Sequence, residues 1–437
     1  MERNVLCDRY RRKMAITLML AISAMAVFFL PQSGTAAESK TTAQEFRTIP
    51  VNEYVDRMKG GWIGQIAGVC WGAPTEFRYQ ERIIPADEVP VWRPEMVNDA
   101  FGQDDLYVEM TFLRTLEEYG LNVSQRQAGI DFANSRYPLW HANVGGRTNL
   151  RRGIAPPDTG HPAFNHCADD IDYQIEADFS GLISPGLPNT VIMLGEKFGG
   201  LMNYGDGLHA GQFIGGIYAE AFFEHDMRRV IEAGLRCIPA ESQYAEMVRD
   251  VLGWYDENPG DWEATWQRIE EKYQKDPDWR RFSCDPGTFN IDAKINGAYI
   301  LLGLLYGEGD PDRTIVIACR AGQDSDCNPS NAGGVLFTMI GFSQIPGRFR
   351  ERLDETRKFD YTEYNVPELI AVCEKLARET VVQAGGRIET DANGTEVFVI
   401  PVHAAQPGEY HPCWDPAPPT GEKYTVDEME KIHEKAE

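Results

Sequence analysis

Residues 321–340 read AGQDSDCNPSNAGGVLFTMI, and the rest of the chain is interpreted around them. Asp324 and Asp326 stand two residues apart, just before Asn328 and Pro329, which suit an N-cap and a first helical residue. The small residues that follow, NAGG, would let another helix approach closely. Two carboxylates in one turn repel each other unless a cation, a proton or water screens them. The stretch therefore predicts a divalent cation site at the start of a buried helix, with an acidic surface turn that caps the helix as the alternative.

A second acidic pair lies far upstream. Asp104 and Asp105 occur in GQDDLYVEM, at the head of an amphipathic segment that predicts a helix over residues 106–119. Acidic residues in a first helical turn interact favourably with the helix dipole, so simple capping is again the alternative.

A glycine-rich helix is predicted from about residue 51, where apolar residues recur on one face. Gly60, Gly64, Gly68 and Gly72 cost helix stability, so they indicate tight packing or the close approach of a ligand. The run ends in WGAPTEF, in which Glu76 follows a helix-breaking proline. A glutamate in that position is more often a surface or capping residue than a catalytic one.

Together these segments resemble the ADP-ribosylglycohydrolase family. The three motifs that carry the resemblance are GAPTEF at 72–77, GQDDL at 102–106 and GQDSDCN at 322–328, and it covers about 51–347. It implies an all-α, orthogonally packed helical globule with two magnesium ions in a central cleft. The implied ligands are Asp104, Asp105, Asp324 and Asp326, and Glu76 would act near the scissile bond, with Asp105 as a second catalytic candidate.

Two positions depart from the family pattern. Gln103 stands where the family usually has Thr or Ser, and Cys327 stands where it usually has Thr. Both are included in the predicted metal site, although a neutral thiol is a poor ligand for magnesium.

The residues themselves support this chemistry. Oxygen ligands suit Mg²⁺, Ca²⁺ or Mn²⁺, and such ions orient sugar hydroxyls and lower the pKa of water. Cleavage at an anomeric carbon develops positive charge that carboxylates stabilise. We therefore expect a metal-dependent hydrolase of a glycosidic or N-glycosidic bond, acting on ADP-ribosyl or another ribosyl or glycosyl compound. The alternatives are a non-catalytic sugar- or nucleotide-binding protein, and a metal-free glycosidase that uses Glu76 with Asp170.

Substrate-binding residues are predicted between and within the motifs. Residues 139–161 form a polar loop with several arginines, which either pair with structural carboxylates or receive a ligand. Acidic residues follow, on a surface that is either solvated or faces the cleft. The predicted set is Asn149, Arg151, Asp170, Asp172, Asp206 and Asn328.

The start of the chain has the layout of a secretory signal. Basic residues precede an apolar run over 14–30, and small residues follow at 34–37, so we expect a signal peptide over 1–37 and an exported protein, periplasmic or secreted. An uncleaved anchor is the alternative. The net charge of −25 argues against nucleic acid or an anionic membrane as a partner. The partner expected from the resemblance is a small-molecule or glycosylated substrate. In an oxidising compartment some cysteines would form disulfides, and the sequence does not select which.

The predicted organisation after the signal peptide is a linker over 38–48, a helical domain over 49–380, and a C-terminal tail over 381–437. The tail alternates polar and apolar residues around Asn393-Gly394, which predicts a β-hairpin appended to the helical body.

Overall fold

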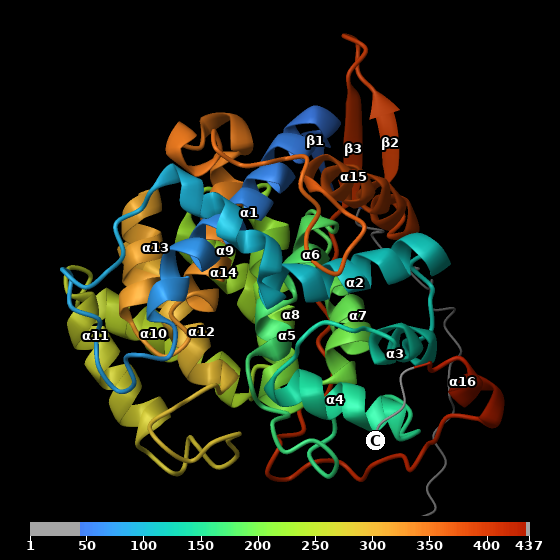
Figure 1. Ribbon diagram of the computed structural model, residues 1–437. Helices are drawn as coiled ribbons and strands as arrows, with labels where there is room; N and C mark the ends of the chain where they lie inside the picture. The colour runs from blue at the N-terminus through green and yellow to red at the C-terminus, as the bar shows by residue number, and fades with distance from the viewer. Residues whose placement is uncertain (1–43, 434–437) are drawn as a thin grey trace, which may run out of the picture. The chain divides into compact units, whose positions relative to one another are not determined.

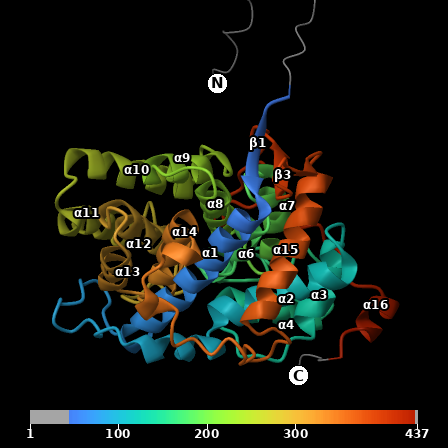
Figure 2. The ribbon, with the colours of Figure 1, turned by 90° about the horizontal axis from the view of Figure 1, so that it is seen from above.

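The protein is built around two helices packed against each other at very short range. The structure is a computed structural model that describes residues 44–433. Helix α1, Val51–Gly72, lies against α14, Cys327–Ile340, and Figure 2 shows α1 passing between α14 and α15, Val366–Gln383.

The glycines of α1 explain this approach. Gly60, Gly64 and Gly68 recur every fourth residue and so share one face of the helix. A Cβ atom at Gly64 would collide with the carbonyl of Gly333, and one at Gly68 would collide with the carbonyl of Pro329. The backbones of the two helices are therefore in direct contact, which only glycine allows.

The start of α14 corrects one local prediction. The helix begins at Cys327 with Asp326 as its N-cap residue, whereas the sequence predicted an N-cap at Asn328 and a first residue at Pro329. The amide of Asn328 donates to the carbonyl of Asp324 at 3.2 Å, and the amide of Ser330 donates to that of Asp326 at 3.0 Å. The hydrogen bonding of α14 therefore begins within the acidic turn, and Asp326 caps the helix.

Further helices pack around this pair (Figure 1), and every residue of α12 is buried. The described residues contain 16 α-helices, and those not yet given are α2 Asp104–Tyr119, α3 Gln125–Ala133, α4 His141–Arg151, α5 Asp172–Ile175, α6 Asp178–Leu182, α7 Pro188–Phe198, α8 Gly205–Ala221, α9 Met227–Arg236, α10 Gln243–Glu257, α11 Trp262–Ile269, α12 Ala293–Tyr306, α13 Pro311–Arg320 and α16 Val426–Glu430. The all-α fold class is confirmed.

A small sheet joins the two ends of the described chain. Strands β1 Phe46–Pro50, β3 Glu396–Pro401 and β2 Arg387–Thr390 lie in the order β1-β3-β2, and both pairs are antiparallel. The predicted hairpin is therefore present, with Gly394 at a φ of 84° in its turn. The third strand of the sheet was not predicted from the sequence, because β1 begins in the predicted linker and leads straight into α1.

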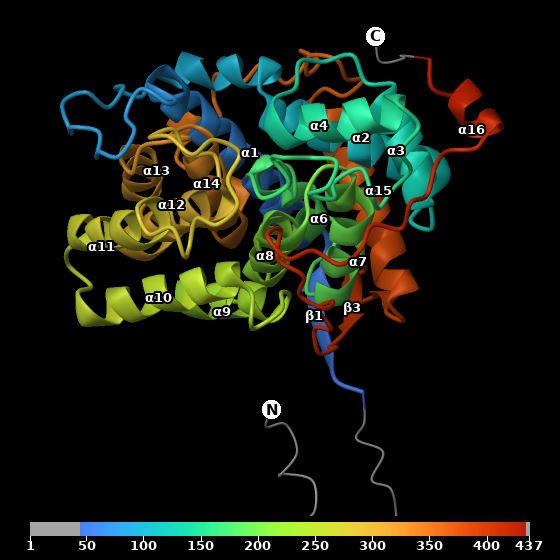
Figure 3. The same ribbon diagram turned by 90° about the horizontal axis from the view of Figure 1, so that it is seen from below.

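The C-terminal tail is fastened to the helical body. Figure 3 shows it running past α7 toward α16. The Tyr410 hydroxyl donates to Asp206 at 2.9 Å, and the amide of Gly421 donates to Asp158 at 2.7 Å. The chain from Gln44 onward forms one compact unit. The predicted signal peptide and most of the predicted linker lie outside the described residues.

Two further features of the described chain are a disulfide and the character of its helices. A disulfide joins Cys167 to Cys284 and so ties the segment before α5 to the segment before α12. Across residues 44–433, no helix combines the length and the apolar character needed to cross a bilayer.

Candidate functional site

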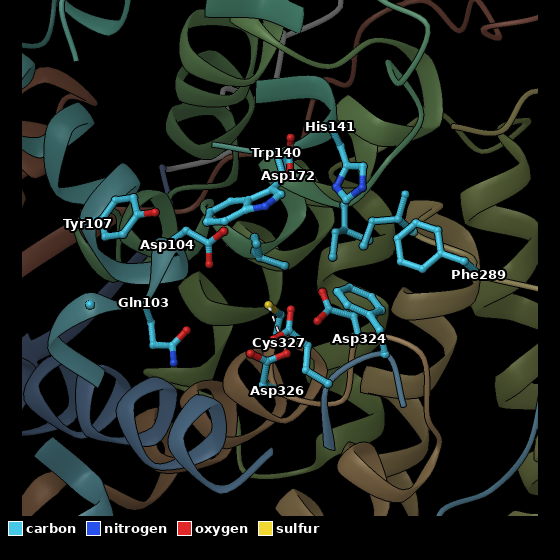
Figure 4. A pocket seen from close by; sticks show the side chains of 16 residues that line it. Gln103, Asp104, Tyr107, Trp140, His141, Asp172, Phe289, Asp324, Asp326 and Cys327 are labelled. Carbon is cyan, nitrogen blue, oxygen red and sulfur yellow. Dashed lines mark hydrogen bonds between the residues drawn. The ribbon is translucent and has the colours of Figure 1, made fainter. Parts of the chain in front are cut away.

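A cavity of about 500 Å³ opens where the N-terminal ends of α2, α4 and α14 meet. Its lining includes the residues of all three sequence motifs: Glu76, Gln103, Asp104, Asp324, Asp326 and Cys327. Figure 4 shows Asp104, Asp172 and the acidic turn at 324–327 facing this space from different elements. The fold thus brings together carboxylates that are separated by more than half of the chain.

The acidic turn is held in place by a neighbouring segment as well as by the first turn of α14. Gly322 and Gln323 both have positive φ, at 88° and 49°, which turns the chain sharply before Asp324. The amide of Gln323 donates to the carbonyl of Tyr79 at 3.0 Å, and the amide of Phe77 donates back to the carbonyl of Gln323 at 2.9 Å. This pairing fixes the segment that carries Glu76 beside the segment that carries Asp324 and Asp326.

The two acidic pairs meet through Cys327. Its thiol donates to Asp105 Oδ1 at 3.0 Å and lies 3.8 Å from Asp326 Oδ1. Asp105 is fully buried, while Asp104 is partly exposed to the cavity. Ligand atoms of Asp324, Asp326 and Cys327 all lie within 4.8 Å of one another. Such a cluster has the dimensions of a site for a single cation.

The carboxylates of this cluster disfavour ionisation of one another. Burial, and next the charge of Asp326, raises the pKa of Asp104 to about 6. Burial and neighbouring carboxylates raise the pKa of Asp105 and of Asp324 well above the ordinary value. Burial raises the pKa of Cys327 as well, so the thiol is neutral. Bound positive charge would relieve this repulsion and favour the ionised carboxylates.

Glu76 and Gln103 stand at the edge of the cavity. Glu76 is exposed and follows the short 3-10 helix η1, Ala73–Thr75. Partial burial, followed by the charges of Asp326 and Asp104, raises the pKa of Glu76. Gln103 precedes α2 and is half-buried. Both therefore reach the space that a substrate would enter.

Asp172 lines the opposite wall, and Asp170 lies behind it. The amide of Asn143 donates to Asp172 Oδ2 at 2.5 Å, and the amide of Ala142 donates to Asp170 Oδ2 at 2.8 Å. Asp170 also accepts from Asn203 Nδ2 at 3.1 Å, and it does not line the cavity. Its role as a sugar ligand or second acid stays a prediction; in the structure its oxygens accept from the backbone and from an amide.

Four other predicted substrate residues also lie outside the cavity lining. The Asn149 amide donates to the carbonyls of Thr159 and Phe164 at 2.9 and 3.0 Å. Arg151 donates to the carbonyl of Ala133, the last residue of α3, at 2.8 Å and to that of Ser135 at 2.9 Å. Asp206 and Asn328 are buried. Asp206 accepts from the amide of Tyr244 at 2.9 Å, and Asn328 donates to Asn296 Oδ1, also at 2.9 Å.

The substrate-binding role predicted for these four residues stays a prediction. In the structure Asn149, Arg151 and Asp206 bond to backbone groups. Asn328 bonds to a side chain of the core, and its Oδ1 atom has no hydrogen-bond partner among the described residues.

The sequence missed the aromatic walls of the cavity. Phe77, Tyr107, Trp140, His141 and Phe289 line it, and Trp140 is 51% exposed. The Phe77 and Phe289 rings lie 4.9 Å apart between centroids, and the His141 and Phe289 rings lie 5.6 Å apart. The one signal in the sequence was the pair Trp140-His141 within the polar loop at 139–161. Phe289 comes from a distant segment that carries no motif.

Fold and site together define an all-α protein with an acidic cavity at the ends of its central helices. The sequence profile of the ADP-ribosylglycohydrolase family matches residues 50–385, and the chain belongs to that family. Enzymes of this family are generally glycosyl hydrolases, and its members are commonly metal-dependent.

Two further comparisons accompany this match. Among solved structures, the chain is similar to one described as an "ADP-ribosylglycohydrolase-related protein complex", with 15% identity and a TM-score of 0.45 over 75% of this chain and 99% of that chain. A search of curated proteins found no match.

Proposed function

We propose that this protein is an exported, metal-dependent hydrolase that cleaves a glycosidic or N-glycosidic bond of a ribosyl or other glycosyl compound. One observation carries the proposal. Asp104, Asp324 and Asp326 line a single cavity with Glu76 at its edge, and the buried Asp105 joins them through the Cys327 thiol. Capping alone would not require two distant acidic turns to meet.

The residues fit a divalent cation. Asp105 Oδ2 and Asp324 Oδ1 are buried and have no hydrogen-bond partner within the described protein. An unpaired buried carboxylate oxygen is costly, so each points to a positively charged ligand. The holding residues would be Asp104, Asp105, Asp324 and Asp326, whose oxygens suit magnesium, calcium or manganese. When bound, the ion would supply positive charge that orients sugar hydroxyls and acidifies water.

Cys327 acts differently from the residue it replaces in the family pattern. Its neutral thiol donates to Asp105, so in this structure it orients a carboxylate. Gln103 keeps an oxygen donor at the edge of the cavity. We therefore assign ion binding to the four aspartates and a positioning role to Cys327.

The protein residues also suit the bond cleavage. In hydrolysis, the oxygen of water bonds to the anomeric carbon, the bond from that carbon to the aglycone breaks, and its electron pair leaves with the aglycone, which gains a proton. The carboxylates around the cavity stabilise the positive charge that develops on the sugar. Glu76 stands at the cavity edge, outside the buried cluster, and is placed to move a proton between water and the aglycone.

The two alternatives, a metal-free glycosidase and a non-catalytic binding protein, have unequal support. The metal-free glycosidase needs Asp170 as a second carboxylate in the cavity, and Asp170 is held behind the wall by backbone amides. A non-catalytic binding protein is favoured by one observation, the thiol of Cys327 at a position where the family pattern has a hydroxyl.

Export is supported by two features. The leader has the composition of a secretory signal, and the chain forms the Cys167–Cys284 disulfide. Disulfides persist mainly in oxidising compartments.

Ion binding by an aspartate-deficient variant tests the proposal. We expect Mg²⁺, Ca²⁺ or Mn²⁺ to raise the melting temperature of the wild type, with about 2.7 kcal/mol of stabilisation at an ion concentration of 100 times Kd. The double variant Asp324→Asn with Asp326→Asn should lose this effect. Asp206→Asn removes a buried carboxylate outside the cavity and should keep it.

Turnover is then measured on ribosides and other glycosides. Hydrolysis that requires the ion and disappears in the double variant supports the proposal. Ion binding without turnover of any glycoside that binds would favour the non-catalytic alternative.

A further inference from the structure

A second group of metal-ligating side chains stands on the wall of the cavity opposite the acidic turn. One ligand atom each of His141, Asp170 and Asp172 lies within 4.8 Å of the other two. Figure 4 shows His141 and Asp172 on that wall, across the cavity from Asp324. None of these three residues is among the four aspartates proposed to hold a divalent ion.

Each of the three side chains keeps a lone pair that no donor occupies. Asp172 accepts one hydrogen bond, from the amide of Asn143 to Oδ2, and no described residue donates to its Oδ1. Asp170 Oδ2 accepts only from the amide of Ala142, and a carboxylate oxygen has a second lone pair. The imidazole of His141 makes no hydrogen bond to a described residue. The group therefore has ligand atoms that the fold leaves unused.

The surrounding structure fixes these ligands. The amides of Ala142 and Asn143, in the first turn of α4, hold the two carboxylates, and Asn203 Nδ2 donates to Asp170 Oδ1 at 3.1 Å. Hydrogen bonds of this kind orient the ligands of metal sites. His141 has a φ of 39°, a left-handed conformation that is uncommon outside glycine and that clusters at ligand-binding and catalytic sites.

The charge of the group is not balanced by the protein. Asp170 and Asp172 are both buried, and neither forms an ion pair with a lysine or arginine of the described chain. Two neighbouring carboxylates repel each other unless a cation or a shared proton lies with them. Burial lowers the pKa of His141, so at pH 7 the imidazole is neutral and offers a lone pair rather than a positive charge. A bound cation would supply the missing charge.

The imidazole selects a different ion from the one that suits the aspartate cluster. Imidazole suits Zn²⁺ and its neighbours in the first transition series, whereas ligands that are all oxygen suit Mg²⁺, Ca²⁺ or Mn²⁺. Ligands of one zinc ion, each at about 2.1 Å, lie about 3.4 Å apart, so a small rotation of the half-buried His141 would bring the group to that spacing. Three protein ligands leave a fourth position for water or a substrate oxygen.

We propose that His141, Asp170 and Asp172 form a second metal site in the cavity, for a transition ion such as Zn²⁺, with one coordination position open to a substrate oxygen. His141 and Asp172 both line the cavity, so a ligand in the cavity would reach an ion held between them. The site goes beyond the proposed hydrolase function and does not depend on it, because it uses none of the four aspartates.

Cobalt binding to the aspartate-deficient protein tests the site. In the intact Asp324→Asn/Asp326→Asn protein, we expect a single Co²⁺ ion to bind in calorimetric titration, and excess Mg²⁺ should not displace it. Adding His141→Asn should weaken this binding at least about a hundredfold, because the nitrogen ligand is lost. Asparagine tolerates the left-handed conformation at residue 141. His166→Asn, which removes an exposed histidine close to His141, is the matched control and should leave the affinity unchanged.

A chemical footprint tests the wild type without any substitution. Diethyl pyrocarbonate modifies accessible neutral imidazoles, and peptide mapping by mass spectrometry locates each adduct. At a Zn²⁺ concentration of about ten times Kd, modification of His141 should be about tenfold slower, because about a tenth of the sites are then free. The exposed His225 should react at the same rate with and without the ion.

The results distinguish the two ion sites. Unchanged Co²⁺ affinity after His141→Asn, or equal reactivity of His141 with and without Zn²⁺, would overturn the second site and favour a proton shared by the two carboxylates. His141→Asn in the otherwise wild-type protein should keep the rise in melting temperature with Mg²⁺ that the proposed function requires. If Mg²⁺ fails to stabilise the wild type while Co²⁺ still binds through His141, the proposed function fails and the second site stands.

Discussion

Replacing Gly68 with alanine tests the close packing of α1 on α14, on which the position of the acidic turn depends. A Cβ atom here would collide with the carbonyl of Pro329 and the amide of Ser330, and both are backbone groups that cannot rotate away. Overpacking costs about 1–3 kcal/mol, and a collision with backbone belongs at the upper end, whereas alanine gains about 1 kcal/mol of helix propensity over glycine. We expect a net loss of about 2 kcal/mol in the free energy of unfolding.

Gly253 provides a matched control. It also lies inside a helix, α10, and a Cβ there would have no atom within 4 Å. Gly253→Ala should therefore stabilise the protein by about 1 kcal/mol. Urea unfolding followed by circular dichroism measures both variants. If Gly68→Ala proves as stable as Gly253→Ala, the direct contact between the two helix backbones is refuted.

Three further predictions concern single groups. Cys327→Ser exchanges a thiol for a hydroxyl, a harder donor, and should tighten Mg²⁺ binding in calorimetric titration; an unchanged Kd would place residue 327 out of reach of the ion. Burial raises the pKa of Asp178 to about 8, and this carboxyl accepts from the Tyr218 hydroxyl at 2.6 Å. Because the folded state holds the proton more tightly than the unfolded state, stability should fall as the pH rises from about 4 toward that value, and Asp178→Asn should flatten the dependence in urea titrations. Loss of the Cys167–Cys284 disulfide, which closes a loop over a sequence separation of 117, should cost about 4–5 kcal/mol, measured on the Cys167→Ala/Cys284→Ala protein against wild type. A loss below about 1 kcal/mol would contradict the loop-entropy argument.

Local sequence patterns were sufficient to predict most of the helices and the position of the two acidic turns at helix starts. The glycine spacing of α1 predicted close packing because its period matches the helix, and Asp104 and Asp324 precede strong helical segments. The start of α14 was misplaced, because Asn328 and Pro329 suit a helix start as well as Asp326 and Cys327 do. Local propensity alone does not choose between them.

Local sequence patterns could not predict the contacts between distant segments. Asn149 and Arg151 look like ligand-binding residues in sequence, yet the fold places carbonyls beside them that need donors. Strands β1 and β3 pair although nearly the whole described chain lies between them in sequence. Residues near β1 in sequence therefore do not predict this pairing. The aromatic wall is a second case, since the rings of His141 and Phe289 come together only after folding.

The contact between α1 and α14 also sets the order in which the protein can be completed. The glycine face of α1 leaves the ribosome early and stays uncovered until residues 327–340 have been made. The donors for an ion are divided in the same way, with Asp104 and Asp105 in the early part and Asp324 and Asp326 in the late part. A nascent, truncated or partly unfolded chain therefore holds only one half of the cluster. Only the completely folded chain would bind the ion tightly. Ion binding would therefore stabilise the native state and would favour only the last stage of folding.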